Sequence, residues 1–190
     1  MAVKPPRTAA KRAAAARSGA GKPASAEGKP ASAERDPAKT GSSKAAEGYR
    51  ARSLARRLAL QALYQIQINP RPWADIQREF AADPEAERVD LNYFKALFGA
   101  IAPNCEALDS RLARLGEIPP RELDPIEHAV LWLGLHELES SLELPYRVAL
   151  AEAVQLAKQF GATDGYKFVN AVLDRAAQEL RPHEYGRPAE

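Results

Sequence analysis

Asp124-Pro-Ile-Glu-His-Ala-Val-Leu-Trp-Leu-Gly-Leu-His-Glu-Leu138 is the stretch of sequence that decides the fold. It opens with a strong helix start. Asp124 can act as N-cap, Pro125 suits the first helical position, and Glu127 stands where it can complete a capping box. Behind that start the segment is apolar on nearly every side to about Ser140. Because such a helix buries its whole surface, we expect it at the centre of the core.

Helical patterns continue on both sides of this segment. Apolar residues recur at the i, i+3, i+4 spacing of an amphipathic helix, and prolines and glycines separate the runs. The first run starts at Tyr49 and ends before Pro70 and Pro72. The others cover about 73–81, 91–102, 104–115, 145–160 and 165–180. Since no segment alternates with period two, strands are not expected, and the sequence predicts an all-α fold of about seven helices.

Residues 1–48 have a different composition. They contain no Leu, Ile, Phe, Trp or Tyr, so they cannot bury enough surface to offset the entropy lost on ordering. They hold ten basic and four acidic residues, against 17 and 21 in residues 49–190, which together give the net charge of +2. We interpret 1–48 as a disordered basic tail, 49–182 as a helical domain and 183–190 as a short flexible C-terminus. The tail fits either contact with a polyanion or a solubilising role.

Several function classes lack their motifs in the 190 residues. There is no Gly-rich phosphate loop, no G-x-S-x-G and no H-E-x-x-H, so an enzyme, a cofactor or a metal is not expected. His128 and His136 stand eight residues apart, and we interpret them and the single cysteine, Cys105, as structural. The longest apolar run, 129–135, is too short to span a bilayer. With no signal-peptide core either, a cytoplasmic location is expected.

The first helix carries a basic and aromatic face. With a rotation of about 100° per residue, three side chains fall on the same side as Arg50, namely Arg57, Gln61 and Tyr64. Arg52 and Arg56 flank this face. Guanidinium groups bind phosphates and stack on bases, and a tyrosine offers a ring face. The pattern fits an RNA-binding surface, but it is at least as typical of an ordinary solvated helix face with arginines, so both interpretations stay open.

A second cluster lies at the start of the last helix. Lys167 stands where the helix dipole disfavours a cation but where backbone N–H groups can help to bind an anion. Phe168 lies beside the core stripe, so it is either a core aromatic or a ring for base stacking. Asp164 can cap the helix, contact a partner, or do both.

These segments resemble the NusB family of transcription antitermination factors. The resemblance rests on 52–65, 123–138 and 148–161 with 167–174, and it spans about 50–181. It implies an all-α fold of two small helical bundles and no chemical reaction. It also implies binding of boxA RNA in nascent ribosomal RNA transcripts, jointly with NusE, a protein of the small ribosomal subunit. The pair would then join an RNA polymerase antitermination complex with other Nus factors.

The resemblance also implies roles for individual residues. By motif position it places RNA contacts at Arg52, Arg56, Tyr64, Lys167 and Phe168, with Asp164 near that surface and Glu127 facing NusE. The chain departs from the common family pattern at Ala151, Gly165, Tyr166 and Ala171.

Two alternatives and one question stay open. One alternative is a module related to the N-terminal part of ribosomal RNA cytosine methyltransferases, which needs a following α/β domain and catalytic cysteines. The other is a helical protein–protein adaptor without an RNA role. Whether the free protein forms a homodimer is also open.

Overall fold

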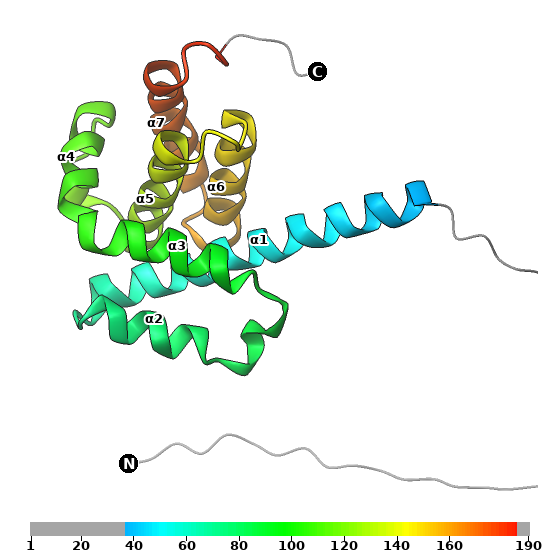
Figure 1. Ribbon diagram of the computed structural model, residues 1–190. Coiled ribbons are helices and arrows are strands. Elements are labelled where there is room, and N and C mark those ends of the chain that lie inside the picture. Colours follow the sequence, from blue (N-terminus) through cyan, green and yellow to red (C-terminus); the bar gives the residue numbers. More distant parts are fainter. Residues whose placement is uncertain (1–36, 186–190) are drawn as a thin grey trace, which may run out of the picture. The chain divides into compact units, whose positions relative to one another are not determined.

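The structure is a computed structural model that describes residues 37–185. Within this range it contains seven α-helices and no strand, as the sequence predicts (Figure 1). The helices are α1 (Pro37–Ile68), α2 (Trp73–Ala81), α3 (Leu91–Ile101), α4 (Cys105–Leu115), α5 (Pro125–Ser140), α6 (Tyr146–Phe160) and α7 (Gly165–Leu180). Short 3-10 turns lie at Pro84–Arg88, Ala102–Asn104 and Pro120–Glu122. None of the described helices is long and apolar enough to cross a membrane.

The start of α1 differs from the expectation. The helix begins at Pro37 and not at Tyr49, so its first twelve residues lie within the segment that the composition predicts to be disordered. Residues 44–50 are exposed along the helix, and their alanines, lysine and glutamate have high helix propensity. Further along the helix, the Tyr49 hydroxyl donates a hydrogen bond to Glu152 of α6. The rest of the expected tail, residues 1–36, lies outside the described residues.

The helices form two bundles that are joined mainly through α1. Helices α1, α2 and α3 pack together, and α4 to α7 pack around α5. Helix α1 also lies against α5 and joins the two bundles (Figure 1). This arrangement confirms the two-bundle fold implied by the family resemblance.

Helix α5 is the centre of the second bundle. Its residues 128–135 are all buried, and the Trp132 side chain donates from Nε1 to Asp109 Oδ1 of α4 at 2.7 Å. His128 Nε2 lies 2.6 Å from the same oxygen, in agreement with a structural histidine. Helix α7 packs so closely on α5 that a Cβ at Gly134 would lie 2.4 Å from Leu173 Cδ1. The expected central position of this helix is therefore confirmed.

The chain after α7 folds back onto the second bundle. Arg181 is buried, and its guanidinium donates to the carbonyl oxygens of Leu138 at 2.6 Å and Ser141 at 2.9 Å. It thereby supplies donors to carbonyls at the end of α5 that lack a partner within the helix. The Tyr185 hydroxyl donates to Asp174 of α7 at 2.9 Å. Residues 183–185 of the segment predicted to be flexible thus form a hydrogen-bonded turn, and 186–190 lie outside the described residues.

Candidate nucleic-acid interface

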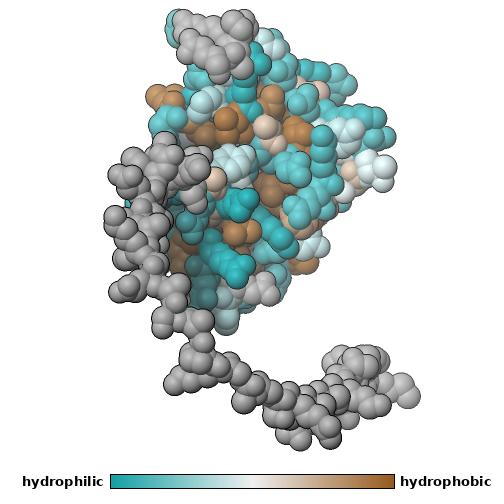
Figure 2. All heavy atoms as spheres, turned by 90° about the vertical axis from the view of Figure 1, so that its right-hand side faces the viewer, coloured by the Kyte–Doolittle hydropathy of each residue, from teal (hydrophilic) through white to brown (hydrophobic). Residues whose placement is uncertain are grey.

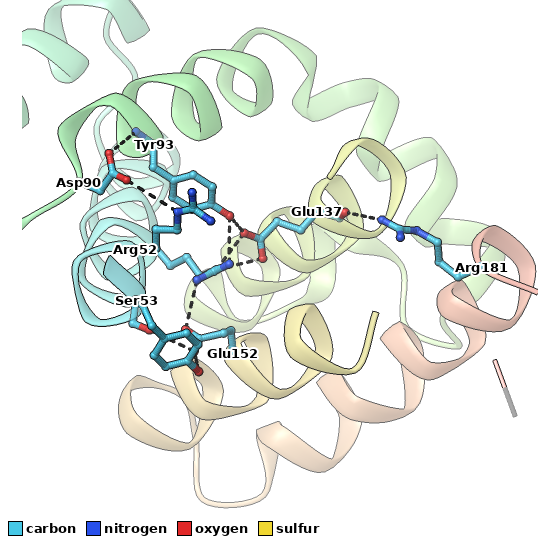
Figure 3. A network of polar contacts seen from close by, with 9 residues as sticks. Arg52, Ser53, Asp90, Tyr93, Glu137, Glu152 and Arg181 are labelled. Atoms are coloured by element: carbon cyan, nitrogen blue, oxygen red, sulfur yellow. Dashed lines mark hydrogen bonds and ion pairs between the residues drawn. The ribbon is translucent and has the colours of Figure 1, made fainter. Parts of the chain in front are cut away.

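Arg56 lies inside the protein and not on the predicted surface. Its side chain is 3% exposed, and its Nε lies 2.8 and 3.1 Å from the two carboxylate oxygens of Glu137 on α5. Its Nη2 donates to the Tyr93 hydroxyl of α3 at 3.0 Å, and its Nη1 lies 3.5 Å from Glu152 Oε2 of α6. These contacts connect α1 with α3, α5 and α6 (Figure 3). The prediction that Arg56 contacts RNA is wrong for this structure, because two inward-facing carboxylates hold its guanidinium.

The environment of this network changes the acidity of its members. Burial raises the pKa of the Glu137 carboxyl, and the adjacent guanidinium of Arg56 only partly opposes that rise. Burial and the neighbouring Glu137 carboxylate raise the pKa of Tyr93, whose hydroxyl donates to Glu137. A buried carboxylate is costly unless it is paired and hydrogen-bonded, so the network depends on the Arg56 charge.

Glu152 connects the same network to the middle of α1. It accepts hydrogen bonds from Tyr49 and, at 3.1 Å, from Ser53 (Figure 3). Because these residues stand one turn apart on α1, Glu152 fixes both the rotation and the position of this part of the helix against α6.

Arg52 lies at the exposed edge of the network. Its side chain is half-exposed, its Nε lies 3.8 Å from Asp90 Oδ2, and its guanidinium carbon lies 5.5 Å from the centre of the Tyr93 ring. Asp90 also caps α3, because it accepts from the Tyr93 backbone N–H at 3.0 Å. An exposed ion pair of this kind contributes little stability, so Arg52 can turn toward an external phosphate at low cost.

The predicted outer face of α1 is exposed in the structure. Arg50, Arg57, Gln61 and Tyr64 all reach the surface, and Tyr64 is 38% exposed. The Arg57 guanidinium carbon lies 5.1 Å from the centre of the Phe160 ring at the end of α6. No carboxylate among the described residues forms an ion pair with Arg57. This face therefore presents cations and a tyrosine ring to solvent.

The start of α7 presents a second set of cations and rings. The exposed Lys167 pairs through Nζ with Asp164 Oδ1 at 2.8 Å. Tyr166 has two cations near its ring, with Lys158 Nζ at 5.0 Å and Lys167 Nζ at 6.0 Å. The Asp164 side chain makes no capping hydrogen bond, so the predicted capping role is wrong for that side chain. Phe168 is half-buried and packs against the core, while part of its side chain reaches solvent.

Three elements meet at one end of the protein and bring these sets close together. Gln67 of α1 donates to the Pro125 carbonyl oxygen at 2.8 Å, which ties the end of α1 to the start of α5. Glu127 of α5 accepts from the Ala162 backbone N–H at 3.3 Å, which ties α5 to the α6–α7 loop. The contact of Arg57 with Phe160 completes the connection. Both the α1 face and the start of α7 therefore border the α6–α7 loop.

Glu127 has a different local role from the one expected. Asp124 accepts from the Ile126 backbone N–H at 2.9 Å, but Glu127 accepts from the α6–α7 loop and does not complete a capping box. A Cβ at Gly165 would lie 1.7 Å from Glu127 Oε1. The departure from the family pattern at Gly165 thus leaves room for this carboxylate.

Several features of the site were not found from the sequence. Lys158 was not singled out, because only the fold places it beside Tyr166. Burial raises the pKa of the Cys105 thiol to about 11, in agreement with a structural cysteine. Among residues 37–185, no three His, Cys, Asp or Glu side chains gather in a way that could hold a metal ion.

An all-α protein of two joined bundles, with cations set against aromatic rings at one end, has the features of a helical nucleic-acid-binding protein. The sequence profile of the NusB family matches residues 53–178. The chain belongs to the NusB family.

The sequence is similar to those of characterised family members. It is 43% identical over 143 residues to the transcription antitermination protein NusB of Methylobacillus flagellatus, which covers 75% of this chain and 93% of that protein. It is 45% identical over 142 residues to the protein of the same name from Hahella chejuensis, with the same two shares covered.

Solved structures have the same fold. NusB of T. maritima aligns with a TM-score of 0.62 at 25% identity and covers 71% of this chain and 96% of its own. A crystal structure of the antitermination factors NusB and NusE in complex with double-stranded RNA aligns with a TM-score of 0.58 at 24% identity and covers 68% and 98%. Because only 24% of the aligned residues are identical, the similarity to this complex shows a common fold and nothing more.

Proposed function

We propose that this protein is a transcription antitermination factor that binds boxA-type RNA in nascent ribosomal RNA transcripts jointly with NusE. The bound pair joins an RNA polymerase antitermination complex with other Nus factors. The protein acts as an adaptor in the cytoplasm and catalyses no reaction. The similar proteins are named transcription antitermination proteins, and one structural neighbour is a complex of NusB and NusE with double-stranded RNA.

The observation that carries the proposal is the exposed α1 face with its continuation at the α6–α7 end. Arg57 lies over Phe160, and Lys167 lies near Tyr166, so cations that can bind phosphates stand beside rings. The proposed RNA-contacting residues are Arg50, Arg52, Arg57, Tyr64, Asp164, Lys167 and Phe168. Arg56 is left out because it is buried.

These residues divide into two kinds of contact. The arginines and Lys167 neutralise phosphates, and this contribution weakens as salt rises. Tyr64 and the exposed part of Phe168 offer rings to unstacked bases. The Asp164–Lys167 pair is exposed, so it opens at little cost when a phosphate approaches.

Glu127 is proposed as the contact with NusE. Its carboxylate lies at the junction of α5 and the α6–α7 loop, where it is half-buried and accepts one hydrogen bond. This position lets it order the loop and offer its remaining lone pairs to a donor of the partner.

The proposal is tested by the binding of fluorescently labelled RNA to the purified full chain. We expect tighter binding of a boxA oligonucleotide than of a scrambled one, and a larger difference when NusE is added. Equal affinity for both RNAs in the presence of NusE would contradict the proposal. Binding of NusE without any binding of RNA would favour the alternative of a protein–protein adaptor.

A further inference from the structure

A groove of about 520 Å³ runs between α1 and α6, and its size falls in the range of small-ligand sites. The buried Leu156 of α6 forms its floor, and Leu54 of α1, 37% exposed, forms an apolar wall. Tyr49, 54% exposed, also lines it. In Figure 1, the N-terminal half of α1 extends to the right, and Figure 2 views the protein from that side. This face shows hydrophobic patches separated by hydrophilic residues. We call this site the α1–α6 groove.

The polar lining of the groove has hydrogen-bonding groups on one side and cations on the other. Gln155 and Gln159 stand one turn apart on α6, and both are exposed. Each amide offers donors and an acceptor, as the edge of a nucleobase requires. Across the groove, α1 contributes the exposed Arg50 and Arg57.

The charge balance of the groove favours an anionic ligand. Glu152 is the one carboxylate among the described lining residues, and its oxygens already accept from Tyr49 and Ser53 and lie near Arg56. The charge of Glu152 is thus compensated from inside the protein. The two lining arginines face solvent with no ion pair to a described residue.

We propose that the α1–α6 groove is a subsite for one unstacked nucleobase of a single-stranded RNA. The base lies against Leu54 and Leu156, its edge bonds the amides of Gln155 and Gln159, and its flanking phosphates meet the two arginines. This inference rests on the proposed function, because it assigns a further part of the same RNA path. The groove continues that path, since Arg57 borders it and also lies over Phe160.

A base fits this site better than a protein segment does. Single-stranded RNA offers what the groove complements, namely a flat apolar face, an edge with donors and acceptors, and adjacent phosphates. A helix or strand of a partner would add an apolar surface without the negative charge that the arginines favour.

The test combines RNA lacking single bases with variants of the full-length chain. A labelled boxA oligonucleotide is prepared with each base in turn replaced by an abasic nucleotide, and affinity is measured by fluorescence anisotropy with NusE present. For the parent, we expect the loss of the seated base to weaken binding about tenfold, because its apolar contact with the leucines and its hydrogen bonds to the amides are lost. In the Leu54→Ser and Gln159→Ala variants, the same abasic RNA should bind only about twofold more weakly than the intact RNA, because the base no longer gains that contact.

Matched variants separate this effect from unspecific loss. Leu142→Ser replaces an exposed leucine between α5 and α6, and Asn92→Ala replaces an exposed amide on α3, so both should keep the parent's sensitivity to every abasic position. Thermal melting checks that each variant is folded. If the groove variants are as sensitive as the parent at every position, the proposal is overturned while the RNA-binding function stands. Unchanged RNA affinity with weakened NusE binding would overturn it in favour of a protein contact, and failure of the parent to bind any RNA would refute both proposals.

Discussion

Arg56 and Arg57 are neighbours in the sequence, but one rotation of about 100° along α1 places them in opposite environments. Arg57 is exposed over the Phe160 ring, where its charge is available to a ligand. Arg56 is buried against Glu137 and has a structural role. The α1 face was predictable because it depends only on helical spacing. The burial of Arg56 was not, because its partner lies 81 residues away in the sequence.

Removal of the Arg56 side chain should destabilise the fold. Arg56→Ala leaves the Glu137 carboxylate buried without its counter-charge, and breaking a buried pair in this way costs about 3–5 kcal/mol. Urea unfolding measures the free energy of unfolding. Arg57→Ala is the matched control and should change it by less than about 0.5 kcal/mol. A loss for Arg56→Ala no larger than that of the control would show that the network does not hold the helices together.

The half-buried His136 predicts a pH dependence of stability. Burial lowers its pKa from 6.5, and the Glu139 carboxylate only partly opposes this. The unfolded chain therefore binds the proton more readily, so this contribution to stability is complete above pH 6.5 and is lost as pH falls through the lower folded pKa. The raised pKa of Glu137 acts with the opposite sign, since its contribution is lost as pH rises.

The comparison of the parent with His136→Gln isolates the histidine, because the Glu137 contribution is common to both. Urea midpoints measured between pH 7.5 and 5 should fall more steeply for the parent than for the variant. Parallel curves would remove His136 from the pH response.

At the scale of the elements, the helix bounds were predictable and the chain ends were not. The bounds of α2 to α7 follow from prolines, glycines and apolar spacing, which are local signals. The turn after α7 is supported by a distant contact from Arg181 to Leu138, and the part of α1 that starts at Tyr49 by one from Tyr49 to Glu152. The α6–α7 loop depends in the same way on Glu127 of α5. Composition carries no information on such contacts.

The junction of α5 with the α6–α7 loop can be tested at Gly165. Gly165→Ala places a methyl group where the Glu127 carboxylate lies, so Glu127 must rotate away and lose its hydrogen bond to Ala162. We expect a loss of about 1 kcal/mol in the free energy of unfolding. In the Glu127→Ala background the same substitution should cost much less, because the clash and the hydrogen bond are both absent. Equal costs in the two backgrounds would contradict this account of the junction.

At the scale of the whole molecule, the packing of α1 on α5 joins the two bundles and positions the end at which we propose that RNA binds. The centrality of α5 was predictable, because its apolar surface leaves no side for solvent. The sequence did not predict that α1 and α7 lie close together, because both border a common loop only in the tertiary fold. The proposed RNA path follows the exposed residues of that end and avoids the buried Arg56.

The salt dependence of RNA affinity is the most direct test of this path. It is measured for the parent, Arg57→Ala and Arg114→Ala with one boxA oligonucleotide in the presence of NusE. Arg114→Ala is the control, because Arg114 is an exposed arginine of α4 outside the proposed path. Loss of one phosphate contact should reduce the slope of log affinity against log salt by about 1 for Arg57→Ala and leave it unchanged for Arg114→Ala. Equal slopes for all three proteins would contradict the claim that the exposed α1 face binds RNA.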